Sequence, residues 1–207
     1  MSKKVLLLTG FEPFGGEKIN PSALAVNEFS GAKINDVEIF TAVVPVIHKK
    51  CVEKTLELIK KLEPKAVLNV GQAGGRTDIT VEKVAINVLD YRIPDNEGNQ
   101  PKFLKITEDG PDAYFATIPA EEIVNTIIKN NIPASLSYTA GTFCCNELFY
   151  GVSHYLRTNK QDVVNGYIHI PFILEQAIES SPPRPSMPLN VIIEGLRIAI
   201  DIITKRL

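Results

Sequence analysis

The chain has 207 residues, of which 44% are hydrophobic and 22% are charged, and its net charge at pH 7 is −2. These values are typical of one globular domain that is large enough to bury a substantial core. The near-neutral charge gives no electrostatic reason to expect a nucleic acid or an anionic membrane as a partner, and no apolar stretch is long enough to span a bilayer.

The first third of the chain alternates between strand-like and helix-like segments. Residues 4–9 are a near-continuous run of apolar, β-capable residues, which is typical of a buried strand. A loop rich in glycine and aromatic residues follows over 10–20, and Pro21 at an early helical position predicts a helix that ends near Phe29. We expect the alternation to continue with a strand at 37–46, a helix at 48–62, a buried strand at 66–70 and a glycine-rich loop at 71–76.

The stretch 78–91 is the longest strand that the pattern predicts. It is rich in β-branched residues, which fit a pleated surface. A strong turn signal follows at 94–99. Over 101–111 the pattern leaves open whether the chain forms a hairpin or an irregular excursion.

Strands and helices alternate again in the second half of the chain. The expected strands are 114–118, 134–138 and 163–170, and the expected helices are 119–130, a helix beginning at 145–146, 172–179 and 189–205. A proline-rich connector precedes the last helix. This order indicates an α/β protein with a mostly parallel sheet covered on both sides. Because no repeat or boundary interrupts it, we expect a single domain over 1–207.

The chain contains three cysteines, Cys51, Cys144 and Cys145. Their odd number and the adjacent pair exclude a disulfide scaffold and favour a reducing cytoplasm. The apolar run near the N-terminus is also too short for a secretory signal. Cys51 lies early in a polar helix, where we expect a structural or merely exposed thiol.

A reactive cysteine is expected where the strand 134–138 turns at Gly141 into the following helix. At a helix N-terminus the unpaired N–H groups and the helix dipole favour an anion, and the thiolate is the nucleophilic form of cysteine. The same N–H groups can hold an oxyanion. One helical step rotates a side chain by about 100°, so we expect only one of Cys144 and Cys145 to face a cleft. Spacing alone leaves that choice open.

Such a thiol needs a base, and three histidines are available. His169 is the preferred candidate because it lies at the carboxyl end of the strand 163–170, where ligands gather in open α/β sheets. A packed strand histidine is the alternative. His154 is expected on the helix after Cys145, as a surface residue or a residue with a local partner. His48 is expected to cap the helix that it begins or to lie on the surface there.

Glu82 is the candidate for the residue that orients the histidine. Alternation along 78–91 places it on the same face as Val84 and Ile86, and a buried carboxylate requires a partner. The alternative is a solvated strand end beside Lys83. Arg92 could position a carbonyl oxygen, although a surface arginine is the default interpretation.

Other kinds of site are not indicated. The glycine-rich loop 71–76 lacks the Gly-Lys-Ser/Thr ending of a phosphate loop and leads into a strand. The histidines are isolated and no Cys-x-x-Cys occurs, so we expect no metal and no cofactor.

Several motifs, taken together and in this order, are specific to one known family. They are TGFEPFGG at 9–16, NPS at 20–22, GQAGGR at 71–76, EKVAIN at 82–87, RIPDNEG at 92–98, YTAGTF at 138–143 with CN at 145–146, and IHIP at 168–171. Through them nearly the whole chain resembles the pyroglutamyl-peptidase I family of cysteine peptidases, also called pyrrolidone-carboxylate peptidases.

The resemblance implies a catalytic triad of Glu82, Cys145 and His169. It selects Cys145 because the family's nucleophile directly precedes an asparagine, as Cys145 precedes Asn146. Cys144 stands where the family more usually has an aliphatic residue. Arg92 matches the arginine that stabilises the oxyanion together with the N–H of the nucleophile.

The resemblance also implies a pocket for pyroglutamate, a neutral lactam. The matching substrate-binding residues are Phe11, Phe14, Asn20, Gln72 and Phe143. An apolar, aromatic slot with a few donors and acceptors suits such a ligand, because the lactam has no free α-amine to pair with a carboxylate. Packing within the loop is the alternative role for the two early phenylalanines.

The resemblance further implies a cytoplasmic homotetramer with a single-domain, three-layer α/β/α open sandwich and a mixed, mostly parallel, twisted sheet. Its expected activity is removal of an N-terminal pyroglutamyl residue from peptides through a thioacyl-enzyme. Two alternatives are a nucleoside phosphorylase-like enzyme of similar fold and a non-catalytic protein that binds pyroglutamyl peptides.

Overall fold

The computed structural model describes residues 4–207, which contain nine strands and six helices. The strands are β1 (Lys4–Phe11), β2 (Lys33–Ile34), β3 (Val37–Val44), β4 (Ala66–Gln72), β5 (Ile79–Glu82), β6 (Val84–Ile86), β7 (Ala113–Phe115), β8 (Ala134–Ser137) and β9 (Val164–Ile170). The helices are α1 (Pro21–Asn27), α2 (Lys50–Leu62), α3 (Ala120–Lys129), α4 (Cys144–Thr158), α5 (Leu174–Ala177) and α6 (Leu189–Thr204).

Seven strands form one sheet in the order β2-β3-β1-β4-β9-β5-β8. The neighbours β3, β1, β4 and β9 are parallel, whereas β5 runs antiparallel to β9 and carries β8 parallel to itself. The short β2 pairs antiparallel with β3 at the edge. The expected mixed, mostly parallel sheet is therefore confirmed.

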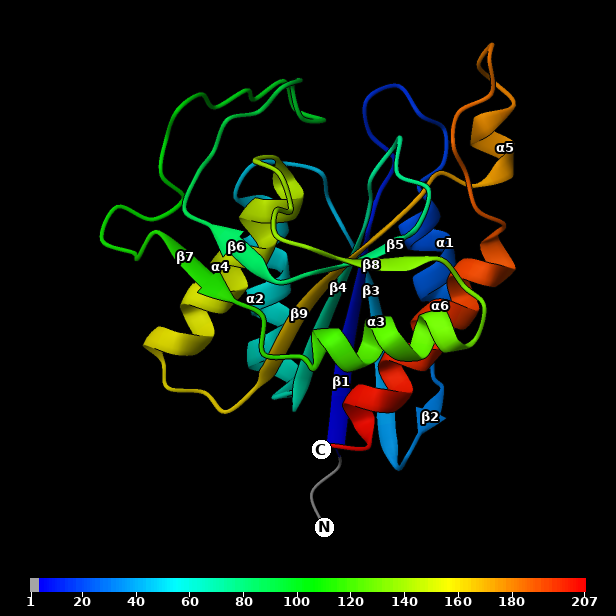
Figure 1. The fold of residues 1–207 in the computed structure, drawn as a ribbon. Coiled ribbons are helices and arrows are strands. Elements are labelled where there is room, and N and C mark those ends of the chain that lie inside the picture. Colours follow the sequence, from blue (N-terminus) through cyan, green and yellow to red (C-terminus); the bar gives the residue numbers. More distant parts are fainter. Residues whose placement is uncertain (1–3) are drawn as a thin grey trace.

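Helices cover both faces of this sheet, with α2 and α4 on one side and α1, α3 and α6 on the other (Figure 1). Because side chains alternate between the two faces of each strand, they pack into two separate cores, one on each side of the sheet. In β1, Leu6 and Leu8 pack in the core beneath α1, α3 and α6, and Leu7 packs in the core beneath α2 and α4. The three-layer α/β/α architecture predicted from the sequence follows from this division.

The prediction of one long strand over 78–91 is wrong. β5 ends at Glu82, and β6 pairs antiparallel with β7 in a separate two-stranded sheet. The chain changes sheets at Lys83, whose N–H donates to the Ser137 carbonyl (2.7 Å) and whose carbonyl accepts from the Ala116 N–H (2.9 Å). The β-branched composition favours extended backbone but does not specify which strand it pairs with.

Val84 and Ile86, which the sequence pattern places on one face with Glu82, belong to β6 of the other sheet, so that comparison of faces within a single strand does not apply. Ile79 and Val81 of β5 pack in the core beneath α1, α3 and α6, so Thr80 and Glu82 point to the opposite face, towards α4. Over 101–111 the chain makes an excursion in which Leu104 forms an isolated bridge with Leu89. Within residues 4–207, no helix is both long and apolar enough to cross a membrane.

Candidate active site

Cys145 lies in the first turn of α4, directly after the turn that leaves β8. Gly141 makes that turn with a positive φ of 79°, a conformation that glycine adopts without a steric penalty. The first intrahelical bond runs from the Glu147 N–H to the Phe143 carbonyl (3.0 Å), so the Cys145 N–H precedes the bonded ladder. Cys145 is half-buried, whereas Cys144 and Cys51 are buried. The structure thus exposes one thiol of the adjacent pair.

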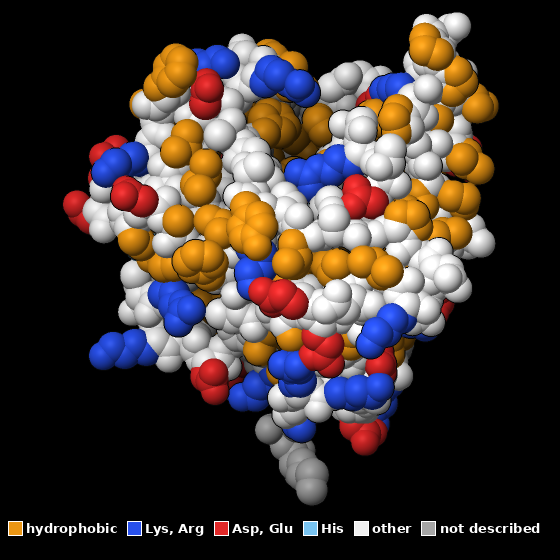
Figure 2. Space-filling view, in the orientation of Figure 1, with side chains coloured by type: hydrophobic (Ala, Val, Ile, Leu, Met, Phe, Trp, Pro, Cys, Tyr) orange, Lys and Arg blue, Asp and Glu red, His pale blue; other side chains and the backbone are white. Residues whose placement is uncertain are grey.

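A cavity of about 310 Å³ opens at this thiol. It lies at the carboxyl ends of β4 and β9, as expected for an open α/β sheet. Its walls are formed by Phe14, Gln72, Ala73, Gly74, Arg76, Arg92, Ile93, Ala140, Gly141, Phe143, Cys145 and His169. On the face in Figure 2, a hollow in the upper half is bordered by hydrophobic side chains and by Lys or Arg side chains.

His169 and Glu82 meet across the antiparallel pair β9 and β5. His169 Nδ1 lies 2.7 Å from Glu82 Oε1, and both side chains are buried. The register explains the contact: Thr80 is opposite His169 and Glu82 is opposite Tyr167, so Glu82 and His169 are diagonal neighbours on one face. That face is the one covered by α4, which carries Cys145.

The charges of these groups depend on one another. Burial alone would lower the pKa of His169, but the neighbouring Cys145 thiolate and Glu82 carboxylate raise it to about 9. Burial likewise opposes ionisation of Glu82, yet its interactions with His169, Ser137 and Arg76 lower the pKa of this carboxyl. Both Glu82 and Cys145 thus favour the protonated form of the buried His169 imidazole.

Arg76 is a site residue that sequence reasoning did not single out. Its Nη1 lies 2.8 Å from Glu82 Oε1 and also hydrogen-bonds the Thr80 hydroxyl, and the side chain lines the cavity. Arg76 belongs to the GQAGGR motif, but its role depends on the loop folding back over β5. The motif alone therefore could not assign it.

Tyr167 is a second residue that the sequence did not reveal. It is fully buried on β9, and its hydroxyl faces Cys145. Burial, together with the neighbouring Cys145, raises the pKa of Tyr167 well above its ordinary value. Its position two residues before His169 was a usable signal, because residues i and i+2 of a strand share a face.

The other predicted site residues divide into two groups. Phe14, Gln72, Arg92 and Phe143 line the cavity, and Arg92 is exposed. The Phe14 and Phe143 rings lie 5.8 Å apart, and Phe143 also packs on Tyr91 at 4.4 Å. The Gln72 side-chain carbonyl accepts from Gln176 (2.9 Å), which fixes that amide.

Phe11 and Asn20 do not reach the cavity wall. Phe11 is buried in the core beneath α2 and α4. Asn20 caps α1: its side-chain carbonyl accepts from the Ser22 N–H (3.0 Å) and its amide donates to the Glu12 carbonyl (2.9 Å). Since both ends of this amide are engaged, Asn20 supports the loop that carries Phe14.

The histidines outside the cavity lie beside other polar side chains. His48 precedes α2, which begins at Lys50 and not at His48 as predicted, and its Nδ1 lies 2.9 Å from Glu147 Oε1. His154 Nδ1 is hydrogen-bonded to the Tyr114 hydroxyl (3.0 Å) on the far part of α4. Of the three histidines, His169 is the one in contact with Cys145.

Comparisons with known proteins all point to one family, and the matches cover nearly the entire chain. A family model described as pyroglutamyl peptidase matches residues 3–206. The pyrrolidone-carboxylate peptidase of Coprothermobacter proteolyticus is 62% identical, with 98% of each chain covered, and that of Fusobacterium nucleatum is 50% identical, with 97% of this chain and 92% of the relative covered.

Solved structures give the same result. The chain is similar to the crystal structure of pyroglutamyl peptidase I from Bacillus amyloliquefaciens, with a TM-score of 0.94, 45% identity and coverage of 98% of this chain and 97% of the other. It is also similar to the pyrrolidone carboxyl peptidase of Pyrococcus furiosus, with a TM-score of 0.95, 36% identity and coverage of 98% and 99%.

Proposed function

The chain belongs to the pyroglutamyl peptidase family, and we propose that Cys145, His169 and Glu82 carry out its peptidase reaction. It is a cysteine peptidase that removes an N-terminal pyroglutamyl residue from peptides. The observation that supports the triad best is the 2.7 Å contact of His169 Nδ1 with Glu82, which leaves the other side of a buried imidazole for the Cys145 thiol.

The proposed reaction begins with the Cys145–His169 ion pair. The thiolate attacks the pyroglutamyl carbonyl carbon, a C–S bond forms, and the carbonyl oxygen becomes an oxyanion. His169 gives its proton to the leaving amine as the C–N bond breaks. Water then attacks the thioester and His169 accepts its proton. The C–S bond breaks, pyroglutamate leaves, and the Cys145 thiolate is restored. Glu82 holds the imidazole in one orientation throughout and stabilises its charged form.

Two groups are suited to stabilise the oxyanion. The Cys145 N–H is at the positive end of α4, and Arg92 lies on the cavity wall with an exposed guanidinium. Within residues 4–207 that guanidinium has no hydrogen-bond partner, so it is available to a ligand. We assign the oxyanion site to these two groups.

The cavity wall is suited to a neutral lactam. Phe14 and Phe143 supply apolar surface, and Gln72 lies at the end of β4 beside the thiol. We place the pyroglutamyl ring against the apolar surface that the two phenylalanines form, with Gln72 beside it. Phe11 and Asn20 contribute by holding the loop that presents Phe14, not by direct contact.

The first test compares the adjacent cysteines. Cys145→Ala should lower the turnover of a fluorogenic pyroglutamyl amide by at least about three orders of magnitude, because the nucleophile is lost. Cys144→Ala should retain most of the turnover, because this thiol does not line the cavity. Circular dichroism of both variants controls for folding. The opposite pattern of activities would assign the nucleophile to Cys144.

The same substrate separates the alternative functions. A thiol peptidase loses its activity after treatment with iodoacetamide and needs no phosphate. A phosphorylase-like enzyme would need phosphate and would survive alkylation, and a binding protein would hold the pyroglutamyl amide without cleaving it. The comparisons name peptidases throughout and give neither alternative support.

We further propose that the enzyme is a homotetramer and that it works in the cytoplasm. The resemblance of the sequence to its family supports the tetramer. Three thiols without a disulfide among residues 4–207 suit a reducing compartment. Fractionation of the source cells, with the pyroglutamyl amide as the assay, tests the location, and activity outside the cytoplasmic fraction would contradict it.

A further inference from the structure

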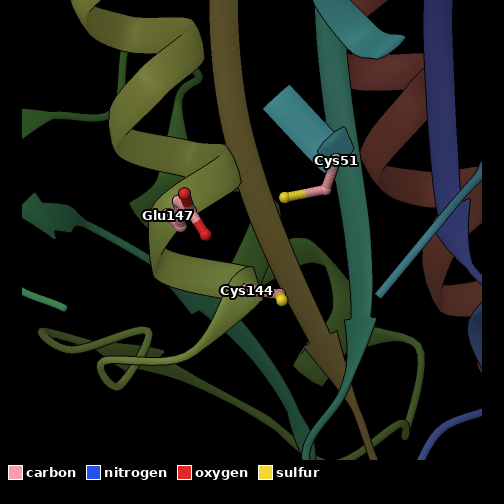
Figure 3. Close-up of side chains that lie close together, drawn as sticks. All are labelled: Cys51, Cys144 and Glu147. Atoms are coloured by element: carbon pink, nitrogen blue, oxygen red, sulfur yellow. The ribbon is translucent and has the colours of Figure 1, made fainter. Parts of the chain in front are cut away.

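A second group of reactive side chains lies behind the active site, between α2 and α4. Figure 3 shows Cys51 extending from α2 towards Cys144 and Glu147, which come from the first turns of α4. The two sulfurs and a Glu147 carboxylate oxygen all lie within 4.8 Å of one another, and all three residues are buried. The peptidase reaction proposed above uses none of them.

The Glu147 carboxylate is held firmly in place. One oxygen accepts from the Lys49 N–H (3.0 Å), and the other accepts from the Tyr91 hydroxyl, which also lies 3.1 Å from the Cys144 sulfur. Oriented carboxylates of this kind are typical of ligands supported by an outer shell.

His48 adds an unsatisfied nitrogen at the edge of the cluster. Its Nδ1 lies 2.9 Å from the Glu147 oxygen but has no hydrogen bond of acceptable geometry, and the atom is buried. A buried polar atom without a hydrogen-bond partner costs free energy.

The donor set has a clear chemical preference. Two thiols, a carboxylate and a nearby imidazole are the groups that bind zinc and similar thiophilic cations. In the metal-free protein, the hydrogen bond with Cys144, burial and the nearby charges raise the pKa of Cys51 well above its ordinary value. The Cys51 thiol then holds its proton, and a cation would have to displace that proton.

We propose that Cys51, Cys144 and Glu147 form a binding site for a thiophilic divalent cation of the zinc type. Binding forms two metal–sulfur bonds and one metal–oxygen bond and releases the two thiol protons to solvent. The cation would join the start of α2 to the start of α4. Its ligand Cys144 directly precedes the proposed nucleophile, Cys145.

The test uses the Cys145→Ala protein, which removes the active-site thiol as a competing ligand. Cd²⁺ serves as the optical probe, because cadmium–thiolate bonds absorb in the ultraviolet, and Zn²⁺ is measured by competition. We expect one equivalent of either cation per chain, a cadmium–thiolate band, and a melting temperature that rises with cation concentration. Absence of a saturable cadmium–thiolate band overturns the proposal.

Variants then locate the site. In the Cys145→Ala background, Cys51→Ala and Cys144→Ala should each weaken binding at least about 100-fold, and Glu147→Gln by about 10- to 100-fold. Glu53→Gln is the matched control, because this carboxylate is exposed on the same turn of α2 and should not alter affinity. Undiminished binding in both cysteine variants overturns the assignment.

A spectroscopic measurement covers the case in which the cysteine variants do not fold. X-ray absorption of the Zn²⁺-loaded Cys145→Ala protein should show two sulfur neighbours at about 2.3 Å. A shell of only nitrogen and oxygen neighbours would exclude this site. Either result decides whether the two cysteines bind the cation, and neither requires a substitution in the cluster.

Discussion

At the scale of single residues, His169 lies between Glu82 and Cys145, and this position determines its charge. Glu82 lies on one side of the ring at 2.7 Å, and Cys145 lies on the other. Their charges outweigh the effect of burial and raise the pKa of His169 to about 9. The imidazolium therefore persists through neutral pH, ready to protonate the leaving amine.

The pH profile of turnover should report this pKa. As pH rises through about 9, His169 loses its proton and the general acid disappears, so activity should fall on the alkaline side near that value. Glu82→Gln removes a negative charge that favours the imidazolium, so the pKa of His169 decreases and the alkaline limb should move down by about one unit. We also expect turnover to fall about 10-fold or more with the fold retained.

The matched control for Glu82→Gln is Glu121→Gln. Glu121 is exposed and paired with Lys83 at 2.6 Å. Its loss should therefore change neither the alkaline limb of the pH profile nor the turnover. Stopped assays across pH 5 to 10, with circular dichroism at each pH, provide the measurement. An alkaline limb that Glu82→Gln leaves in place would remove Glu82 from the triad.

At the scale of secondary-structure elements, Asn146 fixes α4 to β6. Its side chain accepts from the Ile86 N–H (2.9 Å) and donates to the carbonyls of Ile86 (2.8 Å) and Val88 (3.1 Å), and it is fully buried. These bonds satisfy backbone groups on the side of β6 that faces α4. Cys145, the proposed nucleophile, is the preceding residue, so the same bonds hold it in position.

Asn146→Ala should destabilise the fold by about 2–4 kcal/mol, because it leaves buried backbone groups of β6 unpaired. Turnover should decrease as well, since the first turn of α4 loses its anchor. Urea unfolding measures the stability. Asn130→Ala, at the exposed end of α3, is the control and should change stability by less than about 0.5 kcal/mol. Equal losses in both variants would contradict the anchoring role.

The approach of β4 to the active site requires glycine at position 71. A Cβ added there would lie 2.1 Å from the Tyr167 hydroxyl oxygen and 3.1 Å from the Cys145 sulfur. Gly71 is paired with His169 in the parallel register of β4 and β9, so this position lies against the reacting groups. The side chains of Tyr167 and Cys145 fill the space where a larger residue would need room.

Gly71→Ala should therefore lower turnover strongly, because Tyr167 and Cys145 must move. Adding Tyr167→Phe to it should restore part of the activity, because the second change removes the atom at 2.1 Å. The nearest remaining atoms are then ring carbon Cζ and the Cys145 sulfur, both at 3.1 Å. Steady-state kinetics of the two single variants and the double variant test this coupling. A double variant no more active than Gly71→Ala would show that Tyr167 is not the obstacle.

At the scale of the whole molecule, the proposed tetramer makes a prediction about mass. Several large apolar side chains are exposed in the single chain, among them Phe103 (86%), Ile178 (76%) and Phe115 (66%). Light scattering coupled to size-exclusion chromatography should give four times the 22.8 kDa mass of the chain. A mass of 22.8 kDa at every concentration tested would refute the tetramer.

Much of this molecule could be predicted from its sequence. The alternation of strand and helix patterns, with an apolar run in β1 and a clear apolar face on α6, predicted the α/β architecture. The turn at Gly141 before a helical pattern placed a cysteine at a helix start, and the position of His169 at a strand end placed it near the same edge. Local patterns suffice here because they record which side of an element is buried.

Other features depended on the tertiary structure. The sequence shows that 78–91 prefers extended backbone, but the packed fold makes β5 antiparallel to β9 and turns Glu82 towards His169. Arg76, Tyr167 and the cluster of Cys51, Cys144 and Glu147 likewise acquire their neighbours only when distant segments meet. The physical reason is that strand pairing and helix docking are set by long-range packing, and a local pattern does not identify the partner.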